Sequence, residues 1–201
     1  MSRRTRSLRA VLVAATVALG STSVSQQKPK QKKTEAEIKS GLVVNFCRYL
    51  DWSPLPKSET TFEIHIVGKD PLGKAIDELY EKRKVDKHDV AISRFGSWSA
   101  LAEPHRVRAL DCQLLIVAES DPKIVSEILG AIGRRQIVTV GFIPTFLHLG
   151  GDIEVFIQEN KVRFDVAHDH LKLKGVKVSS KLLKSAERNP ASGPRPKEGP
   201  R

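Results

Sequence analysis

Aromatic side chains are scarce in this sequence, since Phe, Tyr and Trp make up only 5% of its 201 residues. The net charge of +11 points at first to nucleic acid. Between residues 34 and 187, however, Lys and Arg are only as numerous as Asp and Glu, so the basic excess lies at the two ends. Domains that bind nucleic acid carry a basic face on the domain itself, usually with aromatic residues among the cations. We therefore expect no nucleic-acid partner.

Long uncharged runs are also rare. One of them, residues 10–20, follows four arginines near the amino terminus and is too short to span a bilayer comfortably. This pattern predicts a signal peptide over residues 1–25, with cleavage after Gly20 or Ser25, and hence a protein exported to the periplasm. An uncleaved single-helix anchor is the alternative, because it shows the same order of charged and apolar residues.

The remainder is long enough for one domain and short for two. Residues 26–33 are polar and basic and predict a disordered lead-in, and residues 188–201, rich in Pro and Gly, predict a disordered basic tail. Residues 34–187 form the predicted domain. The two basic ends suggest a peripheral contact with anionic lipid, and a homodimer is left open.

Helical and strand patterns alternate within that domain. Thr34 and Glu37 form a capping box, which predicts a helix that ends near Trp52-Ser53-Pro54. Further expected helices and strands follow in this order: strand 62–67, helix 71–82, strands 90–95 and 113–118, helix 122–132, strand 137–140, a hairpin from strands 153–157 and 162–166, and a helix after Ser179. The sequence thus predicts a single α/β domain: a mixed, mostly parallel sheet with helices on both faces and an antiparallel hairpin near the C-terminus.

The chain has only two cysteines, Cys47 and Cys112. In an oxidising compartment they could pair, and closing a loop of this size stabilises a protein by roughly 4 kcal/mol on the chain-entropy model. Both also stand in apolar segments, where a buried free thiol is common. The sequence leaves both alternatives open.

Catalytic motifs are incomplete or absent. Gly68 to Lys74 follows the phosphate-loop pattern, but Ala75 replaces the Ser or Thr that would hold magnesium. Instead, Asp70 is expected to cap a helix whose first residue is Pro71. No Gly-x-Ser-x-Gly elbow is present.

Two histidines, His168 and His170, stand close together and with His148 suggest a zinc site of a metal-dependent hydrolase as one alternative. Their spacing matches no recognised zinc motif, and a solvated helix start is the favoured interpretation. We expect no enzyme activity, no catalytic residue, no metal and no cofactor.

Seven segments of the chain form an ordered series of motifs. The first reads Asn45-Phe46-x-x-Tyr49-x-x-Trp52-x-Pro54. The others are residues 62–73, 112–117, 138–140, 150–153, 162–164 and 176–183. Taken together, residues 34–187 resemble the YfiR-like family of periplasmic regulators.

This resemblance implies a non-catalytic protein that docks onto the periplasmic part of an inner-membrane signalling protein and holds it inactive. The partner would be a diguanylate cyclase or a sensor kinase. Docking needs exposed apolar surface, and Phe142, Ile143, Phe146 and Leu147 are the candidates, with a short core helix as the alternative interpretation.

A periplasmic sensor of a small ligand is the alternative function. Its ligand would bind at the carboxyl ends of the parallel strands, near residues 68–73 and 119–122.

Overall fold

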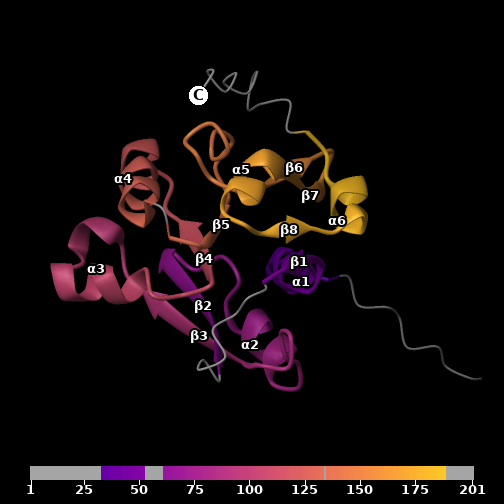
Figure 1. The fold of residues 1–201 in the computed structure, drawn as a ribbon, viewed down its shortest axis with the longest axis horizontal. Coiled ribbons are helices and arrows are strands. Elements are labelled where there is room, and N and C mark those ends of the chain that lie inside the picture. Colours follow the sequence, from indigo (N-terminus) through magenta and orange to yellow (C-terminus); the bar gives the residue numbers. More distant parts are fainter. Residues whose placement is uncertain (1–32, 53–60, 134, 189–201) are drawn as a thin grey trace, which may run out of the picture. The chain divides into compact units, whose positions relative to one another are not determined.

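A computed structural model describes residues 33–52, 61–133 and 135–188 of the chain (Figure 1). Residues 1–32 and 189–201, which hold the expected signal peptide, lead-in and tail, lie outside the described residues. The elements are α1 (Glu35–Tyr49), β1 (Leu50–Asp51), β2 (Thr61–Gly68), α2 (Lys74–Tyr80), β3 (Asp89–Phe95), the 3₁₀ helix η1 (Trp98–Ala100), α3 (Glu103–Ala109), β4 (Leu114–Ala118), α4 (Pro122–Ile132), β5 (Val138–Gly141), β6 (Ile153–Gln158), β7 (Lys161–Val166), α5 (His168–Leu173), β8 (Lys177–Val178) and α6 (Ser180–Ser185).

The main sheet has the order β3-β2-β4-β5-β6-β7, and every neighbouring pair is parallel except the hairpin β6-β7. The central strands β4 and β5 are buried along almost their whole length, as expected for parallel strands with helices on both faces. Glu159 and Asn160 turn the hairpin with φ of 49° and 58°, the backbone of a tight two-residue turn. The predicted fold class is confirmed.

Each face of the sheet carries its own hydrophobic cluster. The helices α1, α2, α5 and α6 lie on one side of the sheet, and α3 and α4 lie on the other (Figure 1). Side chains of the first four belong to one cluster, and those of η1, α3 and α4 belong to the second. Alternate residues of β4 divide between the clusters: Leu114 and Ile116 belong to the first, and Leu115 and Val117 to the second. The alternation follows from the two-residue period of a strand.

The first helix begins as the sequence predicts. The Thr34 hydroxyl accepts a hydrogen bond from the Glu37 amide at 3.2 Å, and the Glu37 carboxylate accepts one from the Thr34 amide at 2.6 Å. This capping box satisfies backbone N–H groups that have no partner within the helix. On the other side of the domain, Asp121 caps α4 in a similar way through the Lys123 amide, with Pro122 in the first turn.

Two short strands join the beginning and the end of the domain. Leu50 pairs with Val178, and Asp51 pairs with Lys177, in an antiparallel β1-β8 ribbon. The Ser179 amide also donates to the Tyr49 carbonyl at 2.9 Å. Strands of two residues carry no periodic pattern, so the sequence did not predict this ribbon.

One helix start was predicted wrongly. The structure begins α2 at Lys74 with Gly73 as its N-cap, three residues later than the expected start at Pro71. Asp70 instead accepts a hydrogen bond from the Leu72 amide at 2.7 Å, which closes a turn before the helix. The helix α3 was not predicted, whereas Ser179 caps the last helix as expected.

Candidate functional site

The docking surface expected around Phe142–Leu147 needs correction. The Phe146 side chain is fully buried, and Leu147 is only 8% exposed. A Cβ atom added at Gly141 or at Gly151 would overlap the Phe146 ring, so the ring lies between two backbone segments that only glycine permits. Phe146 and Leu147 therefore belong to the core, and only Phe142 and Ile143 keep partial exposure.

The loop at the carboxyl end of β2 is held by a salt-bridge network. Arg94 donates to Asp70 at 2.7 Å and to Asp77 at 2.6 Å, and it also donates to the Gly73 carbonyl at 3.0 Å. Gly68 has φ of 97°, and a Cβ there would meet the Ala118 carbonyl at 2.7 Å. The expected ligand region of residues 68–73 and 119–122 is thus brought together, but its carboxylates already have partners: Asp70 pairs with Arg94, and Glu119 and Asp121 accept hydrogen bonds from backbone amides.

The three histidines do not form a metal centre. Within residues 33–52, 61–133 and 135–188, no group of three or more His, Cys, Asp or Glu side chains is placed to hold a metal ion. His168 and His170 lie on α5, as the helix interpretation expects. His170 approaches the buried carboxylate of Asp152 at 3.4 Å.

Asp152 is the centre of a buried polar cluster that sequence reasoning missed. Its Oδ2 atom accepts hydrogen bonds from the backbone amide and hydroxyl of Thr139, both at 2.8 Å, and from Lys174 Nζ at 2.6 Å. Burial opposes ionisation of Asp152, but the hydrogen bonds from His170 and Thr139 and the charge of Lys174 outweigh it, so its pKa lies below the ordinary value. The cluster joins β5, β6 and α5.

Both cysteines have free thiols in the structure. Cys47 belongs to the cluster of α1 and α2, and Cys112 belongs to the cluster on the opposite face of the sheet. Burial raises the pKa of the Cys47 thiol to about 12 and raises that of Cys112 as well. Of the two alternatives left open by the sequence, the structure has free, buried thiols, which are chemically unreactive.

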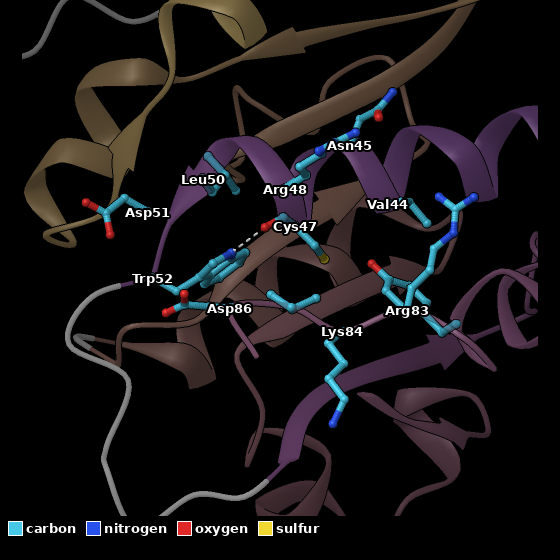
Figure 2. Close-up of a pocket in the computed structure, with 12 residues that line it drawn as sticks. Val44, Asn45, Cys47, Arg48, Leu50, Asp51, Trp52, Arg83, Lys84 and Asp86 are labelled. Carbon is cyan, nitrogen blue, oxygen red and sulfur yellow. Dashed lines mark hydrogen bonds between the residues drawn. The ribbon is translucent and has the colours of Figure 1, made fainter. Parts of the chain in front are cut away.

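A cavity of about 520 Å³ lies between α1 and the turn that connects α2 to β3. Figure 2 shows Cys47 pointing from α1 toward this turn, with Trp52 beside it. The wall on the α1 side consists of Val44, Asn45, Cys47, Arg48, Leu50, Asp51 and Trp52, and the opposite wall of Tyr80, Arg83, Lys84, Val85 and Asp86. The volume lies within the range of sites for small molecules, about 300–1,000 Å³.

Helical spacing places the first wall. Val44, Cys47 and Arg48 lie three and four residues apart, so they share one face of α1. Trp52 folds back across the end of the helix, where its indole N–H donates to the Cys47 carbonyl at 2.9 Å. Its ring packs edge-on against Phe62 with centroids 4.8 Å apart. The Trp52 side chain is therefore held by one polar and one aromatic contact.

A tight turn places the opposite wall. Val85 and His88 exchange backbone hydrogen bonds of 3.0 and 2.8 Å around Asp86 and Lys87. These two central residues have φ of 44° and 73°, which is the conformation of a two-residue hairpin turn. The turn lies immediately before β3, so the cavity is near the amino end of that strand rather than at the carboxyl ends, where the sequence suggested a ligand.

The floor of the cavity is apolar and its rim is charged. Cys47, Trp52, Tyr80 and Val85 are each at most 7% exposed, whereas Arg48 and Arg83 are exposed. The hydroxyl of Tyr80 is buried without a well-formed hydrogen bond. Burial, followed by the neighbouring Cys47 thiol, raises the pKa of Tyr80, so the phenol stays neutral. The floor of the cavity therefore carries neutral side chains, and the charges lie at its rim.

Comparison with known proteins identifies the family. The sequence profile of the YfiR/HmsC-like family matches residues 36–187, which is almost the whole described domain. This chain belongs to the YfiR/HmsC-like family. No curated protein is detectably similar. Members of the YfiR/HmsC-like family are periplasmic, non-catalytic regulators linked to diguanylate cyclases.

Family membership gives the cavity its context. The first YfiR-like motif, which begins at Asn45, supplies most of one wall, so one of the seven segments that resemble the family borders the cavity. The sequence did not reveal the second wall, because Tyr80 and Arg83 reach α1 only through the tertiary fold. Across the described part of the chain, no helix is long and apolar enough to cross a membrane.

Proposed function

We propose that this protein is a periplasmic regulator that binds the periplasmic part of an inner-membrane diguanylate cyclase and inhibits it. The supporting observation is the family match, which runs through the domain from α1 to α6. A sensor kinase with a periplasmic domain is the other partner of the same class.

Inhibition by binding requires that the regulator distinguish two states of its partner. A regulator with equal affinity for the active and inactive cyclase would shift neither population, however tightly it bound. The proposed regulator therefore binds the inactive state of the cyclase more tightly than the active state. A signal that weakens this binding by about 1.4 kcal/mol reduces the affinity tenfold.

We further propose that the docking surface includes Phe142 and Ile143. Both are half-buried side chains that follow β5 directly. Phe142 is covered on one side by the ammonium of Lys39, which lies 4.8 Å from the ring centroid. Phe142 lies at the edge of the cluster beneath α1, and Ile143 lies at the edge of the cluster on the opposite face of the sheet. A partly exposed aromatic ring beside a cation resembles the border between the apolar centre and the charged rim of a protein interface.

Site-specific photocrosslinking in intact envelopes tests the partner and the surface together. A benzoylphenylalanine side chain at position 143 is expected to capture a diguanylate cyclase. The matched control is position 107, where Val107 is 57% exposed on α3 and distant in sequence. Capture at 143 alone supports both proposals, capture at 107 alone rejects the surface, and capture of no cyclase or kinase at either position rejects the function.

Cellular cyclic-di-GMP provides the functional measurement. Deletion of the gene is expected to raise the nucleotide level severalfold, and expression of the protein is expected to restore it. An unchanged level in the deletion strain, with the protein's absence verified, would contradict inhibition of a cyclase.

A further inference from the structure

The rim of the cavity between α1 and the α2–β3 turn carries three cations, Arg48, Arg83 and Lys84, and two carboxylates, Asp51 and Asp86. Lys84 extends away from α1 and pairs with Asp89 at 2.8 Å, and Asp51 pairs with Lys177 at 3.8 Å (Figure 2). Arg48 and Arg83 form no ion pair within the described part of the chain. Elsewhere in the same domain, Arg94 and Arg163 each bind a carboxylate.

The two guanidinium groups come from opposite walls. Arg83 extends from the turn toward α1, and Arg48 projects from α1 above the end of the helix (Figure 2). The guanidinium carbon of Arg48 also lies 6.0 Å from the centroid of the Tyr49 ring, a contact that leaves its N–H groups available. Two guanidinium groups beside one cavity are suited to a carboxylate or a phosphate, which each can bind through paired N–H groups.

Below this rim the cavity is suited to an apolar group. Val44, Leu50, Trp52 and Val85 supply hydrocarbon and indole surface, and the Cys47 thiol is protonated at neutral pH because its pKa is raised to about 12. Burial of an apolar group against such surface contributes about 25 cal/mol per Å².

We infer that this cavity binds a small organic anion, with its apolar body against the floor and its carboxylate or phosphate group between Arg48 and Arg83. A small molecule is favoured over a partner's chain, because the volume of about 520 Å³ is that of a ligand site and its floor residues are at most 7% exposed. The biological purpose of this site rests on the regulator proposed above. Binding itself needs no partner and is measured on the protein alone.

The bound ligand would contact both α1 and the α2–β3 turn, which face each other across the cavity. Its anionic group would hold the α2–β3 turn to α1, and α1 continues directly into the β1-β8 ribbon. Any difference in affinity between two arrangements of this turn would shift their populations in favour of the tighter one. The site is therefore placed to report a periplasmic metabolite to a docked partner.

Trp52 provides a direct reporter. The chain has two tryptophans, and Trp98 lies in the other hydrophobic cluster. Trp98→Phe leaves Trp52 as the sole indole, excited at 295 nm where phenyl groups do not absorb. The probes are 4-phenylbutyrate and phenyl phosphate, with 4-phenyl-1-butanol as the neutral match and inorganic phosphate as the anion alone. The full chain is used throughout.

The expected result is saturable quenching or a shift of Trp52 emission by at least one anionic probe. The neutral alcohol is expected to bind at least tenfold more weakly, and inorganic phosphate is expected to leave the emission unchanged. A rise in melting temperature of the unmodified protein, which follows from binding to the native state, gives a second measurement independent of Trp98→Phe. The carboxylate and phosphate probes show which anionic group the site prefers.

Charge-removing variants locate the binding. Arg83→Gln and Arg48→Gln are each expected to weaken binding of the preferred probe about tenfold, the effect of losing one charge-assisted hydrogen bond. Arg108→Gln on α3 makes the same charge change at an exposed position on the opposite face of the sheet and is the matched control. It is expected to bind as the parent does.

Three outcomes would overturn the inference: no saturable response to either anion up to millimolar concentration, equal binding of the neutral alcohol, or equal loss in Arg83→Gln and Arg108→Gln. If the probes fail while Arg83→Gln weakens capture of a membrane partner, the cavity belongs to the protein interface and the small-molecule assignment is wrong. The proposed regulation of a cyclase stands or falls separately, on the crosslinking and cyclic-di-GMP measurements.

Discussion

Lys174 donates a 2.6 Å hydrogen bond to Asp152, a carboxylate with no solvent exposure. Because Lys174 lies just after α5 and Asp152 just before β6, this pair fixes the last helices to the parallel sheet. Lys174→Met leaves the buried charge without its cation. We expect the free energy of unfolding to fall by about 3 kcal/mol, as measured by urea denaturation. Lys172→Met, exposed on the same helix, is the control; an equal loss in both variants would contradict a special role for the pair.

The same cluster predicts how stability depends on pH. The pKa of Asp152 is lower in the folded protein than its ordinary value, so its ionised form stabilises the fold. This contribution is present above the unfolded pKa near 3.9 and is lost as the pH falls through the folded pKa. Melting temperatures between pH 2 and pH 6 should therefore drop steeply below about pH 4. Asp152→Asn should flatten this drop, whereas Asp169→Asn at an exposed position should not.

Phe146 depends on the two glycines that face it. Gly141→Ala would place a methyl group in the volume of the ring, and we expect a loss of about 1–3 kcal/mol in unfolding free energy. Adding Phe146→Leu should restore part of that loss, because the two sites share one volume. The control is Gly130→Ala in α4, where an added Cβ meets no atom within 4 Å. That variant should gain stability, since alanine favours helix.

Thr34→Ala tests the capping box of α1. The substitution removes the hydroxyl that accepts from the Glu37 amide, and we expect a loss of about 1 kcal/mol, read as a lower melting temperature. Thr34→Ser keeps a hydroxyl and should retain most of the stability. If Thr34→Ser lost as much as Thr34→Ala, the methyl group rather than the cap would be the source of the effect.

The two free thiols are expected to be alkylated slowly in the folded protein. Cys47 and Cys112 are buried, and burial raises the pKa of both thiols, so native protein should react with iodoacetamide far more slowly than protein in urea. Mass spectrometry without reductant should find two alkylated thiols after denaturation. A mass two hydrogens lower, with no alkylation, would instead show a disulfide.

Local signals in the sequence were sufficient for most of the fold. Thr34 with Glu37 marked a helix start, and the apolar run of β4 marked a strand covered on both faces. These patterns lie within a few residues of one another, so they are legible without the tertiary structure. The fold class followed from their order.

The site depended on contacts between distant segments. Phe142 and Phe146 have the same character in the sequence, and only the nearby backbone of Gly141 and Gly151 shows that the second is core. Likewise, Arg94 pairs with Asp70 and Asp77 at the loop where the sequence suggested a ligand. No local pattern in the sequence indicates this pairing. The cavity itself requires α1 and the α2–β3 turn to meet. Motifs therefore identified the family, and one of them contains residues of one wall, but the sequence predicted no cavity there.

The β1-β8 ribbon has a consequence for how the chain acquires its fold. Leu50 pairs with Val178, so this ribbon forms only once residues near the end of the domain are in place. Contacts between residues this far apart in sequence close late and slowly. A chain that ends before residue 177 would lose the strand that pairs with the segment directly after its first helix. The complete surface of the domain is therefore available to a binding partner only after the last residues of the domain have paired with β1.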